Sequence, residues 1–87
     1  MYKATQKQQI ILGNQIIDAD GFGTWEIINY GTNPLTINNT ITLKEGEKYK
    51  LDLLPNVVFE TPIAIKFDTT NNGTSKAAAI LIYNKEV

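Results

Sequence analysis

Residues 34 to 43 read Pro-Leu-Thr-Ile-Asn-Asn-Thr-Ile-Thr-Leu and predict a β-hairpin. If residues 38–40 form the loop, Ile37 lies opposite Ile41 and Leu35 opposite Leu43, so both strands share one apolar face. A two-residue loop would instead set an isoleucine against a threonine, because a slip of one residue exchanges the two faces of a strand. Asparagine also tolerates the left-handed backbone that such a loop needs. The stretch therefore indicates antiparallel β-structure.

The rest of the chain carries the same kind of signal. From Lys48 to Leu53, charged and apolar residues alternate, which is typical of an outer strand with one solvated face. Another strand is expected from Trp25 to Tyr30. No linker or repeat divides the chain. We expect an all-β protein, with residues 10–87 forming a single small antiparallel β-sandwich of jelly-roll or Ig-like type, about seven to eight short strands in all. Residues 1–9 would form a polar N-terminal arm.

A second hairpin is expected around Asn72-Gly73, a dipeptide typical of type I′ turns. In this pairing the apolar residues of 63–67 face Ala78, Ile80 and Ile82, and that face would belong to the core. The competing interpretation is a helix that starts at Ser75 as its N-cap. The Ile-Leu-Ile-Tyr sequence at the end of the segment favours a strand.

The opposite face of that hairpin carries small and apolar side chains, which would let a second surface approach closely. Two alternatives stay open for it: the face packs inside a two-sheet sandwich, or it forms an intersubunit contact. In both cases it is buried in the working state. The candidate interface residues are Ala64, Ala77, Ala79, Leu81 and Tyr83.

Histidine, cysteine and arginine are absent from the 87 residues, and this absence narrows the possible functions. These side chains most often transfer protons near neutral pH, attack as thiolates, bind transition metals or grip phosphates. The single serine, Ser75, has no histidine to activate it, and no pair of acids is marked out for glycosidase chemistry. We therefore expect a protein that is not an enzyme and uses no catalytic residue, cofactor or metal.

Charge and hydropathy argue against two further classes of partner. Eight lysines and nine acidic residues give a net charge of -1, and the lysines stand beside acids rather than in a basic patch. The apolar run at residues 10–12 ends at Gly13, which is too short for a signal-peptide core or a membrane span. We expect neither nucleic acid nor a membrane as a partner.

The Asp- and Gly-rich loop at residues 18–23 is a candidate recognition site. Asp18 and Asp20 resemble the start of a calcium loop, but the EF-hand spacing fails further along, so a turn is favoured over a weak surface calcium site. Trp25 follows this loop and could lie at a rim, where its ring would stack on a sugar. Trp25, Asp18 and Asp20 are the residues of this carbohydrate-binding hypothesis.

Two blocks of the chain resemble small β-sandwich proteins of tailed-bacteriophage virions. Residues 25–38 read WEIINYGTNPLTIN and residues 43–47 read LKEGE, which gives an aromatic strand, Asn-x-Gly, a Pro-led hairpin and a glycine turn. The resemblance implies a structural role in the virion as a capsid decoration or auxiliary subunit, or as a fibre component. Its partners would be capsid or other virion proteins, with the chain present as a homo-oligomer or in repeated copies.

A carbohydrate-binding or adhesin-type module is the alternative function. The position of Trp25 separates the two hypotheses. Burial of its ring in the sandwich favours the structural role, whereas exposure beside a groove favours recognition.

Overall fold

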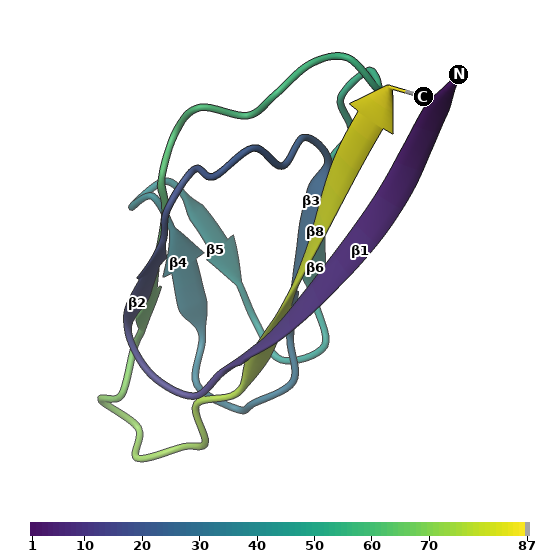
Figure 1. Ribbon diagram of the computed structural model, residues 1–87. Coiled ribbons are helices and arrows are strands. Elements are labelled where there is room, and N and C mark those ends of the chain that lie inside the picture. Colours follow the sequence, from purple (N-terminus) through teal and green to yellow (C-terminus); the bar gives the residue numbers. More distant parts are fainter. Residues whose placement is uncertain (87) are drawn as a thin grey trace.

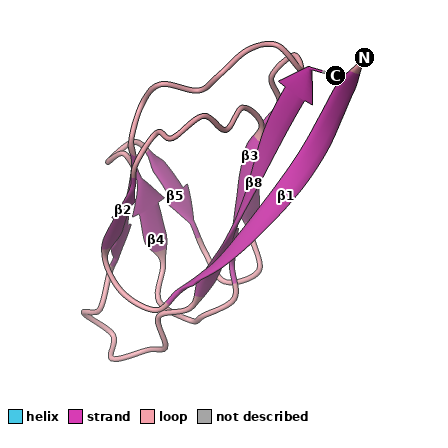
Figure 2. Cartoon of the chain, viewed as in Figure 1, coloured by secondary structure: helices cyan, strands magenta, loops and turns pink. Residues whose placement is uncertain are grey.

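The computed structural model describes residues 1–86, and all of its regular elements are strands (Figure 1, Figure 2). β-Branched and aromatic residues dominate most of them, whereas Gly, Asn and Pro concentrate in the turns. The all-β prediction is confirmed. The strands are β1 (Tyr2–Ile11), β2 (Gln15–Ile17), β3 (Trp25–Asn29), β4 (Leu35–Ile37), β5 (Ile41–Leu43), β6 (Lys48–Leu51), β7 (Ile63–Phe67) and β8 (Ala77–Glu86).

The strands form two antiparallel sheets that enclose the core as a β-sandwich. Sheet A has the order β1-β8-β3-β6, and sheet B has the order β2-β7-β4-β5. The first strand thus pairs with the last, the second with the seventh, the third with the sixth and the fourth with the fifth. This nested pairing is that of a jelly roll, one of the two sandwich types expected.

The hairpin of β4 and β5 has the register that the sequence predicts. Its apolar pairs are Leu35 with Leu43 and Ile37 with Ile41. In the loop, Asn38 and Asn39 have φ values of 50° and 58°. The carboxamide oxygen of Asn38 also accepts the N–H of Ala64 on β7 at 2.7 Å. The asparagine therefore supplies both the left-handed backbone and a link to the neighbouring strand.

The prediction of a second hairpin around Asn72-Gly73 is wrong. β7 belongs to sheet B and β8 to sheet A, so the segment between them crosses from one sheet to the other. Asn72 does have a positive φ of 53°, but it shapes a bend within that crossing. The faces of β8 are also the reverse of those expected. Its buried residues are Ala77, Ala79 and Leu81, whereas Ala78, Ile80 and Ile82 are only partly buried on the outer side.

Large residues on the neighbouring strands explain why alanines line the inner face of β8. Across sheet A, Ile11 of β1 pairs with Ala77, and Ile27 of β3 pairs with Ala79. All four are fully buried. Because the isoleucines fill the space between the sheets, larger side chains on β8 at these positions would overpack the core. The two isoleucines of β8, Ile80 and Ile82, therefore face outward, whereas Leu81 faces the core.

The segment expected as a separate arm instead forms most of strand β1. Tyr2 to Gln9 pair with Glu86 to Ala79 of β8 without interruption. The two strands make a long ribbon along one side of the molecule, at the right of Figure 1. This ribbon contributes to an elongated shape of 48 × 18 × 16 Å. Residue 87, where the predicted domain ends, lies outside the described residues.

Candidate interaction surface

The five candidate interface residues lie in three different environments. Ala77, Ala79 and Leu81 are 0%, 0% and 1% exposed, so a neighbouring molecule cannot reach them. For these three residues the packed-inside alternative holds. Tyr83 is partly buried against the core, and Ala64 lines a hollow on sheet B. The five residues therefore do not form one surface.

Asp20, in the loop 18–23, has a structural partner. Its Oδ1 atom accepts a hydrogen bond from the Tyr83 hydroxyl at 2.7 Å. Burial of the phenol, together with this carboxylate, raises the pKa of Tyr83 to about 12, because both disfavour the phenolate. Within residues 1–86, no three carboxylates gather to hold a metal ion. The contact thus ties the loop to β8, and Asp18 and Asp20 alone are fewer ligands than calcium takes.

Trp25 lies inside the sandwich rather than at a rim. It is 3% exposed, and its ring packs against Tyr49 and Phe59 with centroid separations of 5.6 Å and 5.5 Å. The indole N–H has no hydrogen-bond partner in the protein. A ring covered to this extent offers no face on which a sugar could stack. The burial of Trp25 therefore favours the structural role over recognition.

A buried polar corner at the end of β3 was not anticipated. The carboxamide of Asn29, which is 0% exposed, donates to the carbonyl oxygens of Asn33 and Leu43 at 3.0 Å each. It also accepts the N–H of Gly31 at 3.0 Å. A Cβ on Gly31 would lie 2.2 Å from the carbonyl oxygen of Thr74. The Asn-x-Gly element is thus a brace between loops. The sequence does contain one sign of this brace, because Asn29 occupies the same alternating position as the apolar residues Trp25 and Ile27.

An apolar surface covers part of the outer side of sheet A. Ile10 of β1, Ala78 of β8 and Ile28 of β3 lie side by side in one row. Ile80 and Ile82 continue the surface along β8. Ile10 is 59% exposed, and the other four residues are partly buried. This surface is named here the sheet A face, and it consists of Ile10, Ile28, Ala78, Ile80 and Ile82.

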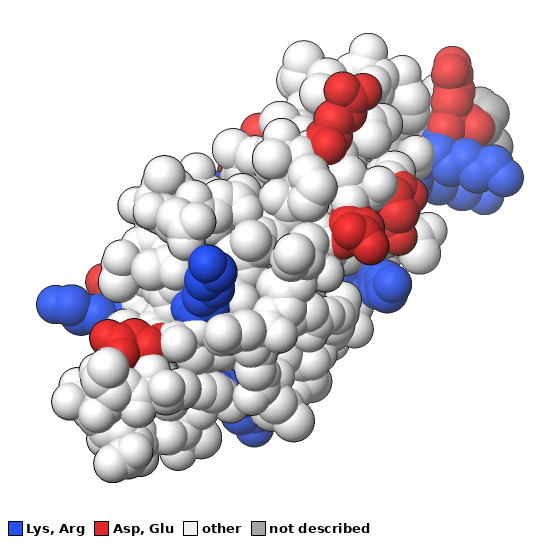
Figure 3. All heavy atoms as spheres, turned by 90° about the vertical axis from the view of Figure 1, so that its left-hand side faces the viewer, with Lys and Arg blue, Asp and Glu red and all other residues white. Residues whose placement is uncertain are grey.

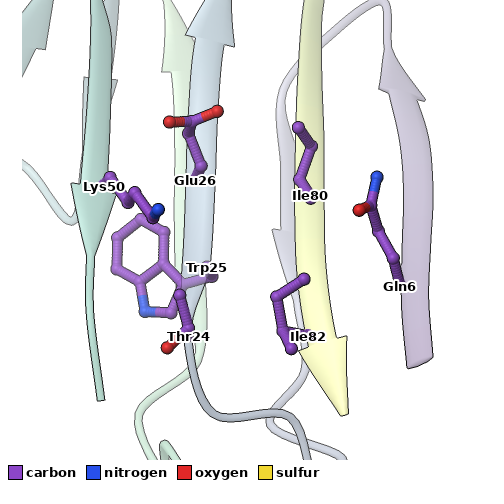
Figure 4. A pocket seen from close by; sticks show the side chains of 7 residues that line it. All are labelled: Gln6, Thr24, Trp25, Glu26, Lys50, Ile80 and Ile82. Carbon is purple, nitrogen blue, oxygen red and sulfur yellow. The ribbon is translucent and has the colours of Figure 1, made fainter. Parts of the chain in front are cut away.

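A cavity of about 230 Å³ opens beside the sheet A face. Figure 4 shows Ile80 and Ile82 on β8, with Glu26 on β3 and Lys50 on β6 across from them. Small-molecule sites are usually larger, roughly 300–1,000 Å³. The cavity is therefore better suited to a side chain of a neighbouring protein than to a drug-sized ligand. Its lining residues are Gln6, Thr24, Trp25, Glu26, Lys50, Ile80 and Ile82.

The outer side of sheet B carries a wider hollow of about 440 Å³ at β2 and β7, where Ile16 is 63% exposed. The side of the molecule at the left of Figure 1 is seen in Figure 3. Acidic and basic side chains are scattered there among uncharged ones. On this view the described residues form no patch of one sign, so this side of the molecule gives no support for electrostatic docking.

Comparisons with protein-family models, with curated proteins and with solved structures find no match for the chain. Residues 1–86 contain no helix that is long and apolar enough to cross a membrane. The function is therefore argued from the surfaces of the molecule.

Proposed function

We propose that this chain is a non-enzymatic structural protein, an auxiliary or decoration subunit of a phage particle that binds neighbouring capsid subunits. The observation that carries the proposal is the sheet A face, in which apolar residues of three adjacent strands adjoin one another on the outside of the sandwich. Apolar surface left outside a core is stabilised when another molecule covers it. The proposed mechanism is therefore non-covalent docking of this face.

Two further features support this kind of partner. The strand order is that of a jelly roll, an architecture found in viral capsid domains and in lectins. This support is an analogy between folds, and a fold alone does not assign a function. The resemblance of residues 25–38 and 43–47 to virion proteins supplies the type of particle. Within that block, the Asn29 brace has a structural role.

The carbohydrate-binding alternative has less support. Of its three candidate residues, Trp25 is buried and Asp20 is bonded to Tyr83. Asp18 is exposed. A sugar site needs a ring face together with polar groups that fix orientation.

Substitution of Ile80, at the middle of the sheet A face, tests the proposal. Ile80 pairs with Gln8 and Glu26, so a lysine here has polar neighbours in the isolated protein. In a docked contact, the substitution removes apolar burial and adds a charge to be desolvated. We expect Ile80→Lys to weaken association with the particle at least about tenfold, since burying an isoleucine contributes roughly 1.5–3 kcal/mol.

The measurement is the amount of tagged chain in the density-gradient band of particles purified from the culture that carries the gene. Thr42→Lys, which adds the same charge on the exposed outer side of sheet B, is the matched control and should stay in the band. Melting temperatures of both purified variants exclude unfolding. Native-level recovery of a folded Ile80→Lys variant would contradict docking through the sheet A face.

A further inference from the structure

β1 is the longest free sheet edge in the described part of the protein. The outer strands are β1 and β6 in sheet A, and β2 and β5 in sheet B. β1 has 10 residues, whereas the other three have 3 or 4. Proteins usually protect an edge by shortening it, by a bulge, by proline or by charged side chains, lysine above all. β1 contains no proline and pairs with β8 without a bulge, and its charged side chains are two lysines, Lys3 and Lys7, which a partner strand can accommodate where they face uncharged residues. Its outward N–H and C=O groups are therefore open to another strand.

We propose that a second copy of this chain occupies this edge, with the two β1 strands antiparallel about a twofold axis at Gln6. Tyr2 then lies opposite Ile10 of the second copy, and Gln6 lies opposite Gln6. The pairing joins the two sheets A into one continuous sheet and satisfies the free backbone groups of both edges. The proposal names one neighbour in the assembly proposed above, yet it can be tested without any particle.

Charge selects this register over the two adjacent ones. Lys3 and Lys7 are the charged side chains of β1. An axis at Thr5 would set Lys3 opposite Lys7, and an axis at Lys7 would set two copies of Lys7 opposite each other. Like charges directly opposite destabilise a pair of strands. With Gln6 on the axis, Lys3 faces Gln9 and Lys7 faces Thr5, so no lysine faces another.

The axis also has to pass through a residue rather than between two residues. Residues that pair across antiparallel strands point to the same side of the sheet, and successive residues of one strand point to opposite sides. An axis between Gln6 and Lys7 would pair an outward residue with an inward one. Among the registers centred on a residue, those centred on Gln6 and Lys7 pair the largest part of β1, and charge favours Gln6.

The same register joins exposed apolar residues. Tyr2 is 43% exposed and Ile10 is 59% exposed, and both lie on the outer side of sheet A. Tyr2 covers Ile10 of the second copy, and symmetry repeats this contact at the other end of the interface. Because the twofold axis is perpendicular to the sheet, the two sheet A faces lie on the same side. The dimer therefore presents one broad apolar surface built from both copies.

Single cysteines test the register cleanly, because the native chain has none. With the axis at Gln6, a Gln6→Cys variant brings two Cα atoms to about 4.5–5.5 Å, within reach of a disulfide. In Ala4→Cys, the two cysteines are offset by four residues along the strands, about 13 Å, and cannot be bridged. We expect mild oxidation to convert Gln6→Cys into a covalent dimer much faster than Ala4→Cys or Gln8→Cys. Equal rates at the three positions, or a native chain that stays monomeric by light scattering at high concentration, would overturn the proposal.

Charge exchange at the axis provides the second test. Gln6→Lys and Gln6→Glu each set like charges opposite each other, and each should weaken dimerisation up to about fivefold. A mixture of the two variants should dimerise better than either one alone. Gln8→Lys adds the same charge on the same side of β1 but faces Ala4, and it should dimerise like the native chain. A mixture no tighter than the separate variants would overturn the Gln6 axis. Dimers that form normally but do not join particles would instead contradict the proposed function.

Discussion

Replacement of Asn29 by aspartate tests the buried corner that braces the sandwich. The substitution keeps the size of the side chain but removes the two N–H bonds that Asn29 donates to the carbonyl oxygens of Asn33 and Leu43. Each buried acceptor left without a donor costs about 1–3 kcal/mol, so Asn29→Asp should lower the free energy of unfolding by about 2–6 kcal/mol at neutral pH. This is a large share of the roughly 4–13 kcal/mol expected for a domain of this size.

The loss should depend on pH in a defined direction. A carboxylate between two carbonyl oxygens and away from water favours protonation, and the protonated acid can donate one of the lost hydrogen bonds. The deficit relative to the native chain should therefore shrink as the pH falls through the raised pKa of this aspartate and level off below about 4, the ordinary range of an aspartate, where the unfolded chain is protonated as well. This deficit is measured by urea unfolding at several pH values, with the fluorescence of the single, buried Trp25 as the readout.

Asn71→Asp is the matched control for this prediction, because Asn71 is exposed in the segment between β7 and β8 and does not have a positive φ. Its free energy of unfolding should stay within about 0.5 kcal/mol of the native value, as for most surface substitutions. If Asn29→Asp lowered the free energy of unfolding at neutral pH by no more than the control does, the role assigned to the corner would be refuted.

Three further predictions follow from the loops. Gly31→Ala should lower the free energy of unfolding in urea by at least about 1–3 kcal/mol, because its Cβ would lie 2.2 Å from the carbonyl oxygen of Thr74. Gly13→Ala, with open space at its Cβ, should change stability by less than about 1 kcal/mol; equal effects of the two variants would contradict the close packing. The pKa of Tyr83 is raised from 10.0 to about 12, so its contribution to stability is complete below pH 10 and lost as the pH rises through 12. Tyr83→Phe should remove this alkaline loss, and an unchanged pH profile of the melting temperature would contradict it. Calcium should leave the native melting temperature unchanged, since Asp20 is bonded to Tyr83; a calcium-dependent rise would show a site in the loop 18–23.

The hairpin at residues 34–43 shows which part of the fold is readable from the sequence. Two short apolar runs flank a loop with residues that accept a left-handed backbone, so local chemistry determines both the turn and the register. The short alternating strand that begins at Lys48 is predicted for the same reason. Such local signals are enough for the all-β class and for the number of strands.

Pairing between distant strands could not be predicted in the same way. β7 and β8 are neighbours in the sequence with matching apolar alternation, yet they lie in different sheets, because β8 pairs with β1 and β3 instead. The inner face of β8 is set by the volume of Ile11 and Ile27 beside it, and this information lies in other strands. The candidate interface residues do not form one surface for this reason, since Ala77, Ala79 and Leu81 are core residues.

The sheet A face and the β1 edge could likewise not be predicted from the sequence. Ile80 and Ile82 have the hydrophobicity of core residues, and only the pairing of β8 shows that they point outward. Residues 1–9 are polar, so their sequence predicts a free arm. Ten residues of β8 are nevertheless available to pair with them, and backbone hydrogen bonding does not require apolar side chains.

The number of copies of the chain in purified particles tests the assembly role most directly. Particles from the culture that carries the gene are banded on a density gradient, and mass spectrometry measures the ratio of this chain to the major capsid protein. The proposed role predicts a fixed ratio that saturates when the chain is overexpressed, because the particle offers a set number of docking positions for the sheet A face. A chain that remains in the soluble fraction, or a ratio that rises without limit with expression, would contradict it.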